Sequence, residues 1–230
     1  MKTVKTKFGK EYFKGYYHRN VGSFTKKDLE KSTNWFSGWF SYLQKFVDLK
    51  KGEGRRVLEI GCSIGGTAHL LYDAGFDTYA TDISSFAISG AKKLAKQLKK
   101  KINFYTFDVE KNIPIDGKFD LIIAFEVIEH LRSPMEAIIR MKNKLKKNGI
   151  LICSTPNAVY DMSQDPTHIN VKSDGEWEKI FRRAGFSKIK KTQVSFLPLF
   201  YNLNRKFHLV IPIPIRSKYI NSPLFIIATG

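Results

Sequence analysis

From residue 55 onward, short apolar runs alternate with amphipathic stretches, and this alternation constrains the fold more than any other feature of the sequence. The apolar runs have the length of buried strands, and the amphipathic stretches repeat their apolar residues at helical spacing. Strands are expected at 56–60, 77–83, 102–108, 119–126, 149–155, 187–196 and 224–229, and helices at 67–74, 84–100, 133–147 and 174–184. Such an alternation predicts an α/β fold with a doubly wound, mainly parallel sheet.

Composition narrows the class of protein. The length of 230 residues fits one domain with an appendage, the 43% apolar content excludes a disordered chain, and the 2 cysteines exclude a disulfide scaffold. The amino terminus lacks the apolar core of a signal peptide, and the apolar stretch 209–215 is too short to span a membrane, so a soluble, cytoplasmic protein is expected. The net charge of +18 favours anionic partners, although a lysine-rich solvated surface explains it equally well.

A glycine-rich turn follows the first strand of this alternation. The segment VLEIGCSIGG places Gly61 and Gly66 at the outer positions of a G-x-G-x-x-G pattern, with Ser63 at the middle position. Glycines let the backbone approach a ligand closely, and the helix that follows offers free N–H groups. Ligands of doubly wound sheets bind at the carboxyl ends of the strands, so the turn marks a candidate binding site.

Acidic side chains stand near the ends of the neighbouring strands. Glu59 lies just before the turn, Asp82 and Asp108 end the second and third strands, and Glu126 ends the fourth. A carboxylate at the position of Asp82 can accept hydrogen bonds from both hydroxyls of a ribose. In a basic chain, this acidic edge suits a ligand with ribose hydroxyls, an amine and a positive centre better than a pyrophosphate.

Five motifs together resemble a known family. VLEIGCSIGG, TYATDIS, FYTFDVE, FDLIIAFEVIEHL and LKKNGILICSTPN look like the successive motifs of the class I S-adenosylmethionine-dependent methyltransferases, over about residues 55–157. The resemblance implies a Rossmann-like seven-stranded sheet in the order 3-2-1-4-5-7-6, with an antiparallel last strand supplied by SPLFIIATG. A dinucleotide-dependent oxidoreductase is the alternative, but nothing in the sequence looks like a hydride-transfer site.

The resemblance also implies a cofactor, S-adenosyl-L-methionine, and the residues that bind it. Gly61, Ser63 and Gly65 would line its methionine part, with Glu59 beneath. Asp82 would hold the ribose, Asp108 the adenine amine, and Phe125 and Glu126 would flank the methyl donor. The full implied set is Glu59, Gly61, Cys62, Ser63, Gly65, Asp82, Ile83, Asp108, Val109, Phe125 and Glu126. Ser63 departs from the glycine that is usual in the family, and its small side chain should still fit.

A Glu-x-x-Glu-His motif starts at Glu126. If a helical turn begins there, Glu126, Glu129 and His130 share one face, and the loop after the fifth strand should bring His168 to it. These four residues offer the ligands of a divalent cation such as magnesium, manganese or zinc. The set resembles the small-RNA 3′-terminal 2′-O-methyltransferases and the quinone-biosynthesis O-methyltransferases. The alternatives are a metal-free catalytic role, with His168 or His130 as the general base near Glu126, and a purely structural role.

The remaining segments concern the acceptor. Residues 1–50 are expected to form an aromatic-rich helical cap on a methyltransferase domain at 51–230, in which 197–222 is an insertion that forms part of a substrate lid. Trp35, Trp39, Leu43 and Phe46 have the spacing of a helix packed on the sheet.

The expected function is O-methylation of a small-molecule hydroxyl, on a sugar, a lipid-linked intermediate or a secondary metabolite. The alternatives are an RNA 2′-O-methyltransferase and a non-catalytic cofactor-binding subunit. Residues 197–215, near several Arg and Lys, are also a candidate for peripheral contact with an anionic membrane.

Overall fold

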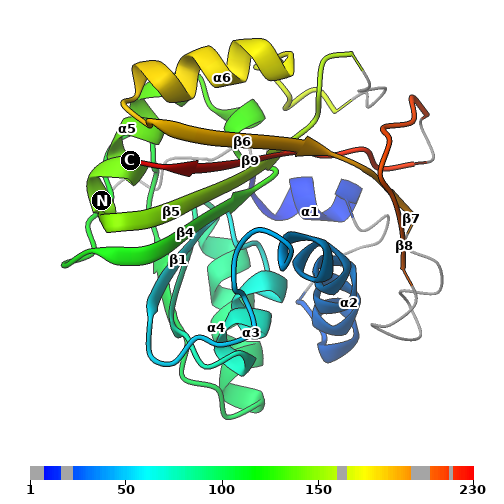
Figure 1. The fold of residues 1–230 in the computed structure, drawn as a ribbon. Helices are drawn as coiled ribbons and strands as arrows, with labels where there is room; N and C mark the ends of the chain where they lie inside the picture. Colours follow the sequence, from blue (N-terminus) through cyan, green and yellow to red (C-terminus); the bar gives the residue numbers. More distant parts are fainter. Residues whose placement is uncertain (1–7, 17–22, 160–164, 198–207, 218–219) are drawn as a thin grey trace.

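The computed structural model describes residues 8–16, 23–159, 165–197, 208–217 and 220–230 (Figure 1). Its centre is a seven-stranded sheet in the order β3-β2-β1-β4-β5-β9-β6. The strands are β1 (Arg56–Ile60), β2 (Asp77–Asp82), β3 (Asn103–Thr106), β4 (Phe119–Phe125), β5 (Leu145–Thr155), β6 (Lys188–Gln193) and β9 (Leu224–Thr229). Only β9 runs antiparallel to its neighbours β5 and β6 in this sheet. The predicted doubly wound fold, strand order and antiparallel last strand are therefore confirmed.

Helices cover both faces of the sheet. They are α1 (Lys10–Tyr16), α2 (Lys26–Leu43), α3 (Gly66–Asp73), α4 (Ser85–Gln97), α5 (Pro134–Lys144) and α6 (Asp174–Arg183), with a 3₁₀ turn η1 (Ile128–His130) after β4. Along β4, Ile122 and Ala124 pack with α5 and α6, whereas Leu121 and Ile123 pack with α2 and α3. This double covering explains why β4 is almost entirely apolar.

Helix α2 belongs to the hydrophobic core. A capping box between Thr25 and Asp28 starts it, and the rings of Trp39 and Phe40 lie against Phe125 of β4. Trp39 is only 2% exposed and also contacts Phe225 of β9. The predicted helix packed on the sheet is confirmed.

Several element boundaries differ from the expectation by a few residues, and the largest difference follows β6. The single strand expected at 187–196 is broken at Val194, so that β6 stays in the main sheet while β7 (Ser195–Leu197) pairs with β8 (Leu209–Ile211) in a separate two-stranded sheet. Residues 198–207 of the expected insertion lie outside the described residues. Ser133 precedes α5; its side chain makes no capping hydrogen bond, and its N–H donates to Glu110 Oε1.

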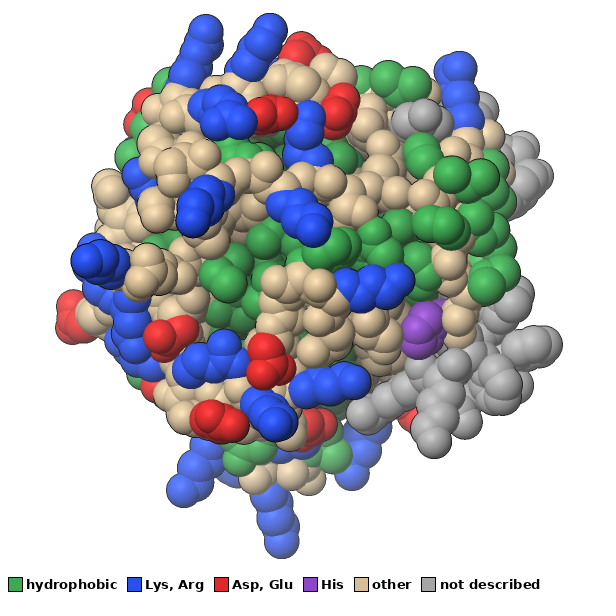
Figure 2. All heavy atoms as spheres, in the orientation of Figure 1, with side chains coloured by type: hydrophobic (Ala, Val, Ile, Leu, Met, Phe, Trp, Pro, Cys, Tyr) green, Lys and Arg blue, Asp and Glu red, His purple; other side chains and the backbone are tan. Residues whose placement is uncertain are grey.

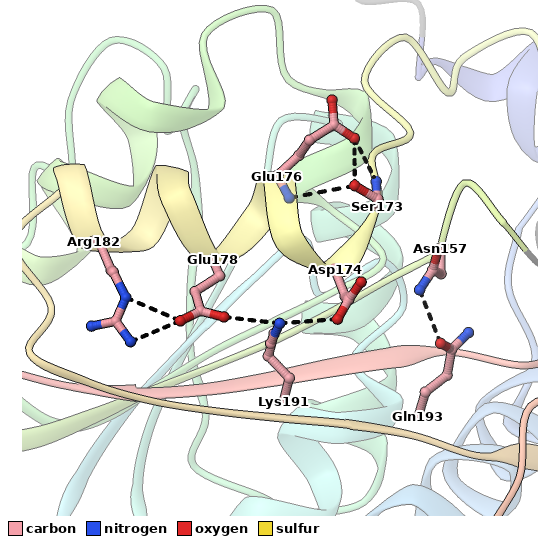
Figure 3. Close-up of polar contacts among 8 residues, drawn as sticks. All are labelled: Asn157, Ser173, Asp174, Glu176, Glu178, Arg182, Lys191 and Gln193. Atoms are coloured by element: carbon pink, nitrogen blue, oxygen red, sulfur yellow. Dashed lines mark hydrogen bonds and ion pairs between the residues drawn. The ribbon is translucent and has the colours of Figure 1, made fainter.

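Polar contacts fasten α6 to the edge strand β6 (Figure 3). Lys191 of β6 bridges Asp174 and Glu178, which lie one turn apart on α6, with both distances 2.9 Å. Near the end of β6, Gln193 accepts a hydrogen bond from Asn157 and donates one to the carbonyl of Ser222. The segments after β5, after β6 and before β9 are thus joined at the carboxyl edge of the sheet. In the described part of the chain, no helix has the length and apolarity needed to cross a bilayer.

Candidate active site

The glycine turn brings the backbone close to the end of β4. Gly61, Ser63 and Gly65 all have positive φ, at 75°, 49° and 92°. A Cβ on Gly61 would lie 2.4 Å from Val127 Cγ2, so any side chain there would force Val127 to move. Gly66 serves packing instead, because a Cβ there would lie 2.1 Å from Ser32 Oγ on α2. The turn therefore leaves bare backbone at the carboxyl edge, as a close-fitting ligand requires.

Asp82 ties the turn to the end of β2. Its two carboxylate oxygens accept hydrogen bonds from the N–H groups of Ser63 (2.9 Å) and Ser84 (2.8 Å). Burial raises the pKa of Asp82, although the N–H groups of Ser84, Ser63 and Ile83 oppose the rise. A carboxylate has about four lone-pair sites, so roughly two stay available to a ligand's hydroxyls. The structure places Asp82 and Ile83 beside the turn, as the sequence predicts.

Glu59 lies beneath the turn and is 4% exposed. Its Oε2 has no hydrogen-bond partner among the described residues. Burial raises the pKa of Glu59 to about 8, outweighing the polar groups of Thr67 and Ala68, and the charge of Asp82 adds to the rise. Burial also raises the pKa of the neighbouring Cys62 thiol. Cys62 is 3% exposed, and a buried thiol with a raised pKa is a poor nucleophile.

The other residues assigned to the cofactor lie at the same edge, with two differences in detail. Strand β3 ends at Thr106, so Asp108 stands in the turn beyond it, where its Oδ1 accepts a hydrogen bond from the Glu110 N–H at 2.9 Å. Val109 beside it is buried. The ring of Phe125 packs among Phe36, Trp39 and other core aromatics. Its backbone, and not its ring, is therefore the part that faces the carboxyl edge.

The expected helical turn at Glu126 is wrong. Glu126 has a φ of +52°, and the 3₁₀ turn starts only at Ile128. The N–H of Glu126 donates to Ser154 on β5, and its Oε1 accepts a hydrogen bond from the Ser154 hydroxyl at 2.8 Å. Strand pairing thus extends to Glu126 and turns its carboxylate towards Ser154, so it does not share a face with Glu129 and His130.

Glu129, His130 and His168 do come together. Each offers a ligand atom, and these atoms all lie within 4.8 Å of one another. Glu129 is fully buried, and its Oε1 lies 4.0 Å from His130 Nε2. The centroids of the two imidazole rings are 4.8 Å apart. The backbone explains the encounter, because the Glu129 carbonyl accepts hydrogen bonds from the N–H groups of Ile169 and Asn170 and so holds the loop that carries His168.

The sequence reasoning missed several residues at this site. The ring of Phe8 lies against His130, with centroids 5.5 Å apart, and also contacts Tyr12 of α1. Thr167 contacts His130 through its hydroxyl, and Asp165 accepts a hydrogen bond from that hydroxyl. The Asp-Pro-Thr-His sequence was the available signal for the latter pair, because Asp and Thr side chains commonly bond to neighbouring groups in turns.

The sequence matches known proteins over most of its length. Residues 33–191 match the family model described as a methyltransferase domain. The ubiquinone biosynthesis O-methyltransferase of Rickettsia felis is 30% identical over 159 residues, which cover 60% of this chain and 64% of that protein. The protein of the same name from Rickettsia canadensis is 31% identical over 159 residues, covering 60% of this chain and 66% of the relative. The matches span just under two thirds of the length of these relatives.

Solved structures share the fold. A magnesium protoporphyrin IX methyltransferase from Synechocystis, with bound S-adenosylhomocysteine, superposes with a TM-score of 0.61 at 19% identity, covering 96% of this chain and 98% of that one. A phosphoethanolamine N-methyltransferase from Haemonchus contortus, in complex with S-adenosyl-L-methionine, gives a TM-score of 0.67 at 16% identity, covering 96% of this chain and 59% of that one. At these sequence identities, the similarity to the solved structures supports the fold and no more specific property.

Proposed function

Because this chain belongs to the class I S-adenosylmethionine-dependent methyltransferase family, we propose that it methylates a hydroxyl oxygen of a small molecule. The observation that carries the proposal is the pair of adjacent imidazoles, His130 and His168, beside a buried carboxylate at the carboxyl edge of the sheet. Imidazole is the side chain best suited to accept a proton near neutral pH, which an attacking hydroxyl must lose. The relatives named as O-methyltransferases support oxygen as the acceptor atom.

The residues at the glycine turn fit S-adenosyl-L-methionine, which supplies an electrophilic methyl group on a positively charged sulfur. The bare backbone of Gly61 and Gly65 admits its methionine part, and Asp82 has lone pairs for the ribose hydroxyls. Asp108, just beyond the end of β3, would accept a hydrogen bond from the adenine amine. The remaining assigned residues are Glu59, Cys62, Ser63, Ile83, Val109, Phe125 and Glu126. The acidic groups at this edge complement the positive charge of the cofactor.

We assign the removal of the acceptor's proton to the cluster after β4. His168 or His130 takes the proton directly, or the cluster holds a divalent cation that acidifies the hydroxyl. Ligand atoms around a cation with bonds of about 2.1 Å lie roughly 3–4 Å apart, so Glu129, His130 and His168 would need to contract slightly from 4.8 Å. Glu126 is not part of this cluster, and its Oε1 accepts the hydrogen bond of the Ser154 hydroxyl.

We place the acceptor between this cluster and the aromatic side chains of α1. Phe8, just before α1, lies against His130 and contacts Tyr12 of α1, and Phe13 of this helix packs on Phe86, just beyond Asp82. In this proposal α1 is part of the cap and residues 197–222 form part of the substrate lid. A pocket with aromatic walls and a few polar groups suits a partly apolar acceptor.

A transfer assay tests this function. The enzyme is incubated with methyl-labelled cofactor and phenolics, sugar nucleotides or short RNAs, with and without a chelator. We expect label in a small-molecule hydroxyl, and none when Asp82→Ala replaces the wild type. Label confined to RNA would show an RNA 2′-O-methyltransferase instead, and cofactor bound without any transfer would favour a non-catalytic subunit. Loss of transfer with chelator, restored by added metal, identifies the cation route.

We also propose that an anionic membrane surface is a peripheral partner. Leu209 and Ile213 are 47% and 62% exposed, and they lie in the segment that leaves the carboxyl edge after β6. Figure 2 shows hydrophobic side chains gathered on the side where Figure 1 places β7 and β8. An exposed apolar segment on a chain of net charge +18 suits an anionic bilayer.

Vesicle co-sedimentation tests the membrane contact. The wild type should bind vesicles that contain phosphatidylglycerol at low salt, and Ile213→Asp should weaken this binding. The control is Leu98→Asp, because Leu98 is 38% exposed at the end of α4, on the opposite edge of the sheet. Equal binding by both variants, or no binding by the wild type, would contradict the proposal.

A further inference from the structure

The loop that carries His168 also contacts the other imidazole of the cluster. His130 Nδ1 lies 3.1 Å from the carbonyl oxygen of Thr167 and 3.0 Å from its hydroxyl oxygen. A carbonyl oxygen only accepts hydrogen bonds, so this contact requires a hydrogen on Nδ1. The Thr167 hydroxyl donates to Asp165 Oδ1 at 2.6 Å, which leaves its lone pairs for His130. Both Thr167 oxygens therefore favour the same state of the ring.

From this geometry we propose that Thr167, held by Asp165, is a positioning residue that keeps neutral His130 in its Nδ1–H tautomer. The lone pair of a neutral imidazole then lies on Nε2, the nitrogen that is 4.0 Å from Glu129 Oε1. Nε2 can therefore accept the acceptor's proton or bind a cation. This catalytic consequence rests on the proposed function, whereas the tautomer itself does not.

Asp165 holds Thr167 in its position beside His130. Its Oδ1 accepts hydrogen bonds from both the N–H and the hydroxyl of Thr167, at 2.7 and 2.6 Å. Its Oδ2 lies 3.9 Å from His168 Nε2, and its carbonyl accepts from the His168 N–H. Although burial opposes them, the hydrogen bonds from Thr167 hold the pKa of Asp165 below its usual range. One short loop thus sets the orientation of both imidazoles.

The tautomer can be read directly by NMR. The cofactor-free, full-length protein is labelled with ¹⁵N-histidine, and long-range ¹H–¹⁵N spectra are recorded at pH 8. The chain has 5 histidines, so the spectrum is small, and His130→Gln identifies the signals of His130. We expect a protonated Nδ1 and an unprotonated Nε2. A wild-type ring with its hydrogen on Nε2, or with both nitrogens protonated, would overturn the proposal whether or not methyl transfer is found.

Two variants at Thr167 separate positioning from folding. Thr167→Val keeps the shape and the backbone carbonyl but removes the hydroxyl, so the His130 signals should move towards a mixture of tautomers. Turnover should fall about 10-fold or more while cofactor affinity is unchanged, as is usual when an outer-shell partner of a functional imidazole is lost. Thr167→Ser restores the hydroxyl and should restore both spectrum and turnover. Identical His130 spectra for the Val and Ser variants would show that the hydroxyl does not set the tautomer.

Discussion

Two buried titratable groups of opposite type predict an unusual dependence of stability on pH. Burial raises the pKa of Glu59 from 4.5 to about 8. Burial lowers the pKa of His69 from 6.5 to about 4, and the positive charge of Lys100 acts in the same direction. His69 is 2% exposed, and neither ring nitrogen has a hydrogen-bond partner among the described residues. Both groups are therefore neutral in the folded, cofactor-free protein near pH 6.

The two groups act on the free energy of unfolding with opposite signs. Folded Glu59 holds a proton that the unfolded chain releases, so its contribution is complete below pH 4.5 and is lost as the pH rises to about 8. At about 1.36 kcal/mol per pH unit, the loss is roughly 5 kcal/mol. Folded His69 excludes a proton that the unfolded chain binds, so its contribution is complete above pH 6.5 and is lost as the pH falls to about 4, a loss of roughly 3 kcal/mol.

Together, the two contributions give a free energy of unfolding that is nearly constant at first and then falls as the pH rises. Between pH 4.5 and 6.5 the two slopes oppose each other, so the free energy of unfolding should change little. Above pH 6.5 only Glu59 of these two groups titrates, and its contribution to the free energy of unfolding should drop by roughly 2 kcal/mol by pH 8. A drop of this size is a large fraction of the roughly 5–15 kcal/mol that holds a typical domain folded.

Urea unfolding of the cofactor-free protein at a series of pH values measures this profile. In Glu59→Gln the fall above pH 6.5 should vanish, and stability should rise between pH 4.5 and 6.5 because His69 then acts alone. In His69→Gln, stability should fall across the whole range. Asp82, whose pKa burial also raises, is present in every variant, so the differences between profiles isolate the two groups. A Glu59→Gln protein that keeps the wild-type fall between pH 6.5 and 8 would refute the reasoning.

Three further outcomes are expected. His168→Ala should lower turnover at least about 100-fold at unchanged cofactor affinity, as loss of a general base does; unchanged turnover in a steady-state assay would remove His168 from the chemistry. Gly61→Ala should weaken cofactor binding in calorimetry and destabilise the protein by about 1–3 kcal/mol, since its Cβ meets Val127, whereas Gly54→Ala, with a similar φ of 74° and nothing within 4 Å, should keep cofactor affinity. Trp39→Ala should cost about 3–5 kcal/mol in urea unfolding, and a loss below about 1 kcal/mol would mean that α2 is a removable cap and not core.

The cofactor half of the site was predictable because it follows from strand ends. Parallel strands bring their carboxyl ends to one edge, so Gly61, Asp82 and Asp108 meet there whatever the rest of the chain does. The spacing of aromatic residues likewise predicted that Trp39 would lie in the core. These features depend on local periodicity and on the general rules of sheet connection.

The acceptor half was less predictable because it depends on single backbone angles and long-range contacts. Glu126 has a left-handed φ and therefore lies outside the cluster of Glu129, His130 and His168, and the Glu-x-x-Glu-His motif does not predict that angle. The ring of Phe8 reaches His130 across more than half of the sequence, a contact that no periodicity encodes. His168 lies beside His130 and Glu129, as predicted. The hydrogen bonds that hold its loop to the Glu129 carbonyl come from backbone N–H groups, so no residue pattern predicts them.

The insertion between β6 and β9 also has an evolutionary consequence. In topology it is an enlarged hairpin loop, because β6 and β9 are adjacent antiparallel strands. Each doubling of the length of a loop costs only about 0.6 kcal/mol in closure entropy, so this segment can lengthen, shorten or change composition without unfolding the sheet. The residues assigned to the cofactor stand on β1 to β4 or in the turns that directly follow these strands, and so lie outside this segment of the chain. If this segment is part of the substrate lid, as proposed above, a lineage can exchange it while inheriting the methyl-donor side intact, and new substrates become accessible through changes in one stretch of sequence.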